Sequence, residues 1–255
     1  MVGLDIASLQ SDRGIAFGGL AAVVLLAWLY LWRSAAGMDH AAMAMGAMPR
    51  AADPGALALT FVMWTVMMAG MMLPSAAPAI LLYGTLVRKN GARGTVLPGI
   101  SIFAGAYLLV WTAFSAAATL LQVSLENASL MTPAMTLAGA GLSAVALVAT
   151  GLYQLTPLKQ ACLSKCRNPL EFFMMRWRAG PAGAFRMGLE HGAYCLGCCW
   201  VLMLLLFVAG VMNLAWVALI AAFVFAEKLL PRARLISHAA GAMLILSGIW
   251  VFTGI

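Results

Sequence analysis

Long apolar runs separated by short polar segments make up nearly the whole chain. Seven such runs can be followed, near residues 13–32, 56–83, 97–122, 133–157, 187–208, 211–229 and 235–254. A helix needs about 20 predominantly apolar residues to cross a bilayer. The pattern therefore predicts an all-α fold, a polytopic transmembrane helix bundle of about seven spans that forms a single integral membrane domain over residues 1–255.

The composition agrees with this pattern. Charged residues make up 9% of the chain, AVILMFWYC residues make up 64%, and the mean hydropathy is +0.97. These values lie far from the usual balance of a soluble domain. The net charge of +7 does not indicate nucleic acid as a partner, because the basic residues stand in short segments between apolar runs. We expect the lipid bilayer as the surrounding partner.

The first apolar run could be a cleaved signal peptide or a retained span. A secretory signal has a basic start and a small-residue cleavage site, whereas this run is long and follows Asp5 and Asp12. We therefore expect a retained transmembrane helix.

Connections that are rich in basic residues alternate along the chain with connections that have none. Three segments are rich in Lys and Arg, namely 88–93, 158–186 and 228–234, whereas 123–132 and 209–213 have neither. Under the positive-inside rule, the basic segments face the cytoplasm. The sequence thus predicts a multi-pass protein of the bacterial inner membrane with its N-terminus inside and its C-terminus outside.

The segment 37–50 is rich in methionine and, by this count, is an outer loop. It includes Met38, His40, Met43 and Met45 among small residues. Thioethers beside an imidazole suit copper, because soft ligands prefer soft ions. An amphipathic surface helix that dips its Met side into lipid explains the pattern equally well. We keep both readings, metal capture and lipid contact.

A second group of methionines stands at helical spacing within the run 56–83. Met67 and Met71 are one turn apart, and Met68 and Met72 form the neighbouring row. Such a stripe is more often packing than a ligand series, but other soft donors in the chain favour the ligand reading.

Cysteine and histidine concentrate in two places. Cys162 and Cys166 are an i, i+4 pair beside basic residues, which can offer two thiolates to one metal. The stretch GLEHGAYCLGCCW carries His191, Cys195, Cys198 and Cys199. On a helix His191, Cys195 and Cys198 fall within roughly 60°, with Cys199 beside them. Each cysteine alone is more often a small buried hydrophobe than a ligand, so their clustering is what indicates a metal site.

Two glycines, Gly188 and Gly192, lie one turn apart near this cluster, so a neighbouring helix can approach it closely. We therefore expect the site to lie between helices. Glu227, Lys228 and His238 stand at span ends and are interpreted as groups that snorkel to the interface.

Three motifs together, MMAGMMLPSAAP, TPLKQACLSKC and GLEHGAYCLGCCW, resemble a bacterial family of predicted metal-binding integral membrane proteins of unassigned function. The resemblance covers most of residues 56 to 254. It implies metal binding by residues at the matching positions: Met67, Met68, Met71, Met72, Cys162, Cys166, His191, Cys195 and Cys198.

The leading hypothesis is an inner-membrane protein that handles copper, either by moving Cu(I) across the membrane or by holding it for delivery to a cuproenzyme. The expected cofactor is a copper ion as Cu(I), with zinc or another metal as alternatives, and the expected partner is a periplasmic copper chaperone or a cuproenzyme. The alternative is a membrane-embedded thiol-redox protein, or an assembly factor, that uses the Cys195-x-x-Cys198 pair. A purely structural role for the cysteines is the third reading. The sequence contains no nucleotide-binding glycine loop and no Ser/His/Asp arrangement, so we expect no hydrolytic enzyme and no catalytic residues.

Overall fold

The computed structural model describes residues 6–44, 54–90, 94–132 and 134–254. Within these residues the chain is helical apart from short connections and one isolated bridge between Met131 and Leu137. The helices are α1 (Ile6–Ala44), α2 (Pro54–Lys89), α3 (Leu97–Asn127), α4 (Ala140–Leu155), α5 (Pro157–Arg167), α6 (Pro169–Arg176), α7 (Gly180–Leu204), α8 (Leu206–Ala209), α9 (Leu214–Leu229) and α10 (Ala233–Thr253). The all-α prediction is confirmed.

Five segments of the described chain are long and apolar enough to cross a membrane. They are Ser11–Gly37, Pro54–Lys89, Leu97–Asn127, Gly180–Ala209 and Ala233–Thr253. The helices α4 and α5 pass the same test as a pair, with a 63° bend between them. The run near 211–229 becomes α9, a helix of 16 residues, which is shorter than a typical span. The count of seven spans and the orientation of the termini stay predictions.

Two of the polar segments between the apolar runs contain helix. The Met-rich segment 37–50 is helical as far as Ala44, because its alanines and methionines favour helix and continue α1. The basic segment 158–186 holds most of α5, all of α6 and the first turns of α7. Each of these three helices has proline in its first turn, where the missing N–H costs nothing. Proline thus divides this segment into separate helices.

The fourth span begins later than the sequence predicts. Residues 128–132 and 134–139 form an irregular segment before α4, with positive φ at Ser129, Met135 and Gly139. The left-handed conformation is unfavourable within a helix, and it delays the start of α4 to Ala140. Thr136 and Gly210 lie in contact where this segment meets the connection between α8 and α9.

The tightest helix contacts are made at glycine. A Cβ on Gly188 of α7 would stand 2.4 Å from the Phe103 carbonyl oxygen of α3, and one on Gly192 would stand 2.9 Å from the Val110 side chain. The predicted close approach of a neighbouring helix is therefore confirmed. The helices α4 and α10 approach in the same way, since a Cβ on Gly151 would stand 2.7 Å from the Gly241 carbonyl oxygen.

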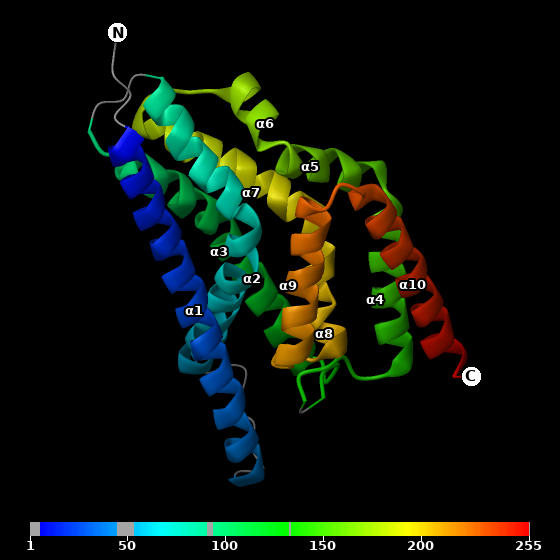
Figure 1. Ribbon diagram of the computed structural model, residues 1–255. Helices are drawn as coiled ribbons and strands as arrows, with labels where there is room; N and C mark the ends of the chain where they lie inside the picture. The colour runs from blue at the N-terminus through cyan, green and yellow to red at the C-terminus, as the bar shows by residue number, and fades with distance from the viewer. Residues whose placement is uncertain (1–5, 45–53, 91–93, 133, 255) are drawn as a thin grey trace.

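Figure 1 shows how these helices are arranged. Most of them run between the upper and lower sides of the bundle, whereas α5 and α6 lie along the upper side. The lower end of α1 projects beyond the other helices. A buried ion pair of 3.3 Å between Asp12 and Arg88 joins α1 to the end of α2, and Asp12 also accepts a hydrogen bond from the Val96 N–H before α3. The core between α2, α3, α7 and α9 holds the cysteines described next.

Candidate metal centre

Cys195 lies at the centre of a buried polar cluster. It stands in the middle of α7, and none of its surface is exposed. Its Sγ is 3.0 Å from the hydroxyl of Tyr107 on α3, and either atom can be the donor. The Lys228 ammonium of α9 donates to the same Sγ at 3.0 Å. Three helices therefore converge on one thiol.

A fourth helix, α2, completes this cluster. Lys228 also donates to the Ser75 hydroxyl at 2.8 Å, and Ser75 in turn donates to the Met72 carbonyl oxygen at 2.9 Å. Tyr107 donates to that same carbonyl at 3.2 Å. These bonds satisfy groups that would be costly to bury without partners, and they fix the position of Lys228 beside the thiol of Cys195.

Two more thiols of α7 lie against Cys195. Cys198 and Cys199 are both buried, and both donate to the Cys195 carbonyl oxygen, at 3.1 Å and 2.9 Å. The Sγ of Cys199 also lies 3.9 Å from the Sδ of Met72. A thioether of α2 thus faces a thiol of α7.

The remaining two cysteines come from α5, which lies across this part of α7. Cys166 is half-buried and packs against the apolar cluster that contains Cys195 and Cys198. The Sγ of Cys162 packs against Gly197, where an added Cβ would stand 2.8 Å away. All five cysteines are free thiols, and the structure gathers them at one contact between α5 and α7.

His191 lies one turn before Cys195 and is also buried. Its ring stands among the rings of Phe103, Tyr107 and Phe172, with centroid separations of 5.6 to 6.0 Å. Its Nδ1 has no hydrogen-bond partner among the described residues. A buried, unsatisfied nitrogen is costly to keep, so His191 differs from a core histidine whose ring is fully hydrogen-bonded.

The methionine stripe faces the core. Met67, Met68, Met71 and Met72 are each 1% exposed or less, and they belong to the same apolar cluster as the α7 cysteines. Met72 is the member whose sulfur contacts a thiol. The prolines Pro74 and Pro78 stand inside α2, which nevertheless continues through both.

The described residues contain no group of three or more His, Cys, Asp and Glu side chains already placed to hold a metal ion. Methionine does not belong to that set of residue types. The soft donors that meet here are the thiols of Cys195 and Cys199 and the thioether of Met72. A sulfur set of this kind selects Cu(I) over hard cations.

A second buried polar cluster lies beside the first. Lys159 of α5 is fully buried and donates to both carboxylate oxygens of Glu227 at 2.7 and 2.8 Å. Ser237 of α10 donates to Glu227 at 2.5 Å, and Lys159 also donates to Gln154. The interpretation of Glu227 and Lys228 as snorkelling groups is wrong, because 1% and 6% of their surfaces are exposed. Partners on neighbouring helices hold both of them inside, whereas His238 is exposed.

Residues 61–251 match a protein family described as PpoB2, copper chaperone. The chain belongs to this family. The matched range includes every cysteine and most of the helices described above. The metal that the resemblance implies is thus copper. The expectation of a family without an assigned function is wrong, because this family is described as a copper chaperone. Searches of curated proteins and of solved structures gave no match.

The structure does not describe the side chains that are predicted to capture copper in the outer loop. Met38, His40 and Met43 fall in the last turns of α1, where the structure describes the backbone alone, and Met45 lies outside the described residues.

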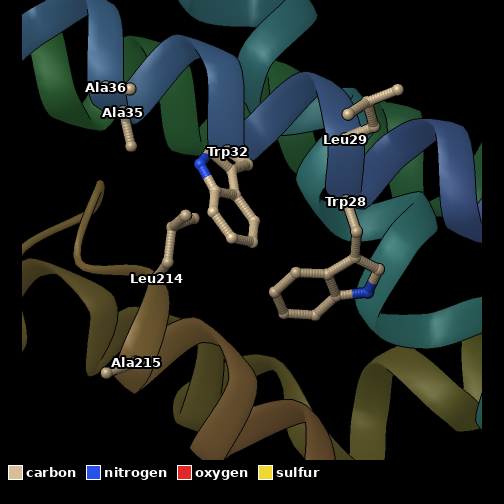
Figure 2. Close-up of a pocket in the computed structure, with 7 residues that line it drawn as sticks. All are labelled: Trp28, Leu29, Trp32, Ala35, Ala36, Leu214 and Ala215. Carbon is tan, nitrogen blue, oxygen red and sulfur yellow. The ribbon is translucent and has the colours of Figure 1, made fainter.

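A separate apolar groove of about 610 Å³ lies between α1 and the start of α9. Figure 2 shows the indole rings of Trp28 and Trp32 on one side and Leu214 and Ala215 on the other. Its lining offers no thiol, thioether or imidazole. The groove is therefore distinct from the cysteine centre.

Sequence reasoning missed three residues of the centre: Ser75, Tyr107 and Lys228. Each is a polar side chain in or at the end of an apolar run, which is the signal that could have found them. Their partners are far apart in sequence, however, and helix periodicity relates only residues of one helix.

Proposed function

We propose that this chain is a membrane-embedded copper chaperone that holds Cu(I) at the contact between α2 and α7. The ligands are the thiolates of Cys195 and Cys199 and the thioether of Met72. His191 and Cys198 lie next to this set and serve as additional donors when copper enters or leaves. The ion is cargo, and the protein delivers it to a cuproenzyme or to a periplasmic copper chaperone.

The observation that carries this proposal is the contact of soft sulfur donors from different helices in a buried position, in a chain of the copper chaperone family. Thiolate and thioether ligands favour Cu(I), and burial protects the ion from oxidants and from hard competing ligands. Copper binding releases the thiol protons, so the affinity rises with pH as for other thiolate sites.

The thiols of α5 extend the site toward the basic side of the bundle. Cys166 packs against the apolar cluster that contains Cys195 and Cys198, and Cys162 packs against Gly197. We propose that this pair exchanges copper with the central site. Under the positive-inside rule, α5 and α6 lie at the cytoplasmic surface of the bacterial inner membrane. The methionines Met67, Met68 and Met71 then continue the row of soft donors from Met72 toward the other face.

The proposal is tested by loading the purified protein with Cu(I) under anaerobic conditions in lipid nanodiscs. The wild type should hold about one tightly bound copper ion per chain, with sulfur ligands in its X-ray absorption spectrum. The double variant Cys195→Ser/Cys199→Ser should lose this copper while it stays monodisperse, because a hydroxyl is a hard and weakly acidic ligand.

Methionine variants separate ligation from packing. Met72→Leu should weaken Cu(I) binding by about tenfold or more, because it removes a soft donor at nearly constant volume. Met203→Leu is the matched control, since Met203 is equally buried on α7, whereas the hydrogen bond between a thiol and a thioether among the described residues joins Cys199 to Met72. Full copper in the cysteine double variant would refute the site.

One observation favours a thiol-redox function as the second candidate. The ammonium of Lys228 lies against Cys195, and a cationic neighbour stabilises a thiolate and raises its reactivity. In that case the pair Cys195 and Cys198 should form a reversible disulfide, and the purified protein should be active without metal. Mass spectrometry of the protein after mild oxidation distinguishes the two candidates.

A further inference from the structure

Lys228 is the charged side chain in contact with the proposed copper ligands. Its Nζ donates to the Cys195 Sγ at 3.0 Å and to the Ser75 hydroxyl at 2.8 Å, and 6% of its surface is exposed. Within the described part of the chain no carboxylate forms an ion pair with it. The Cys195 thiol also forms a hydrogen bond with the neutral Tyr107 hydroxyl.

The adjacent polar cluster does not supply the missing negative charge. Glu227 precedes Lys228 on α9, but its carboxylate binds Lys159 through both oxygens and also accepts from Ser237. That ion pair is neutral as a unit. The positive charge of Lys228 is therefore left for the sulfur centre to balance.

The charge of a loaded site depends on the metal. Two thiolates carry two negative charges, so a monovalent ion between them leaves one net negative charge, whereas a divalent ion leaves none. Adding the ammonium of Lys228 makes the monovalent complex neutral and gives the divalent complex one net positive charge. An uncompensated charge is costly in a low-dielectric interior. Electrostatics thus favours binding of the monovalent ion over the divalent ion, in addition to the preference that comes from ligand softness.

We propose that Lys228 is a specificity-determining residue that makes this centre selective for monovalent copper over divalent ions such as zinc. The inference rests on the proposed function, because it takes Cys195 and Cys199 as thiolate ligands. Ser75 and the carbonyl of Met72 hold the ammonium beside the metal position without adding charge. Lys228 itself need not bind the metal.

The test measures the dissociation constants of Cu(I) and Zn(II) for the full chain in nanodiscs, by competition with chromophoric chelators without oxygen. Lys228→Met should weaken Cu(I) binding by about 100-fold, while Zn(II) binding stays equal or becomes tighter. Lys228→Arg keeps the charge and should keep the ratio of the two constants within about tenfold. Lys165→Met is the control, because Lys165 is an exposed lysine of α5 paired with exposed Glu171.

A second pair of variants decides the question if Lys228→Met does not fold. Ser75→Asp places a carboxylate beside the ammonium and cancels its charge. Ser75→Asn introduces a neutral side chain of nearly the same size and shape as aspartate. The aspartate should shift selectivity toward Zn(II), and the asparagine should not.

The outcomes separate this inference from the function on which it rests. A wild-type protein that binds no Cu(I) refutes the proposed function and the inference with it. Wild-type Cu(I) binding with an unchanged ratio in Lys228→Met, or in Ser75→Asp, refutes the inference alone. Equal weakening of both metals also refutes it, because it assigns Lys228 a packing role only.

Discussion

Glu227 and Lys228 are neighbours in sequence, yet their side chains enter separate clusters on different sides of α9. Glu227 joins α9 to α5 and α10 through Lys159 and Ser237. Lys228 joins α9 to α2 and α7 through Ser75 and Cys195. Successive residues of a helix point about 100° apart, so one helix end connects both halves of the bundle.

Replacing Glu227 by Gln should destabilise the protein strongly. The change leaves the buried ammonium of Lys159 without a counter-charge, which typically costs about 3 kcal/mol or more. The double variant Lys159→Met/Glu227→Met removes both charges and should recover most of this loss. Unfolding in a denaturing detergent measures the difference, and copper stoichiometry should stay unchanged in the double variant. If the double variant instead loses as much stability as the single variants Glu227→Met and Lys159→Met added together, the ion pair contributes little.

At the residue scale, the sequence could predict the soft donors but not their electrostatic surroundings. The spacing of Cys195, Cys198 and Cys199 follows from one helix, and all three are buried as expected. The contact of Lys228 with Cys195 joins residues 33 positions apart on two helices. Such a contact depends on helix packing, which the periodicity of a single sequence does not encode.

The pairing of α3 with α7 shows what the helices contribute to the site. Gly188 and Gly192 let the backbones meet, and this places Tyr107 within 3.0 Å of the Cys195 thiol. A larger residue at either glycine would force these two helices apart. The position of the hydroxyl beside the thiol therefore depends on two small residues on α7.

Gly188→Ala should destabilise the protein by about 1–3 kcal/mol and weaken Cu(I) binding. Its Cβ would lie 2.4 Å from the Phe103 carbonyl oxygen, which belongs to a helix backbone that cannot yield without a shift of α3. Gly105→Ala is the matched control on α3, where an added Cβ meets nothing within 4 Å. That change should be neutral or stabilising by up to about 1 kcal/mol. Thermal unfolding of both variants checks the contrast, and equal stability of the two would contradict close packing at Gly188.

Hydropathy predicted the existence of the long helices but not their ends or bends. The three longest, α1, α2 and α3, were found because their apolar runs are uninterrupted. The bend between α4 and α5 follows from Pro157, and the preceding Thr156 accepts a hydrogen bond from the Lys159 N–H. This cap starts a new helix within the basic segment. A count of apolar residues does not distinguish such a break from the end of a span.

For the whole molecule, α5 and α6 lie along one side of the bundle (Figure 1). These two helices hold much of the basic segment 158–186. The lower side carries the irregular residues 128–132 and 134–139 and the connection before α9, and these residues include no Lys or Arg. This asymmetry of charge agrees with the predicted orientation. The copper path proposed above would then have two different ends, thiols on the basic side and methionines on the other.

Reporter fusions should place these two sides on opposite faces of the inner membrane. Green fluorescent protein fused after Lys89 or Lys165 should fluoresce, because it folds in the cytoplasm, and alkaline phosphatase at the same positions should be inactive. A fusion after Ser129 should give the reverse result, since the connection after α3 has no basic residue to retain it inside. The same reporter activity at Lys165 and Ser129 would contradict an odd number of crossings between them. It would also remove the assignment of Cys162 and Cys166 to the cytoplasmic end of the copper path.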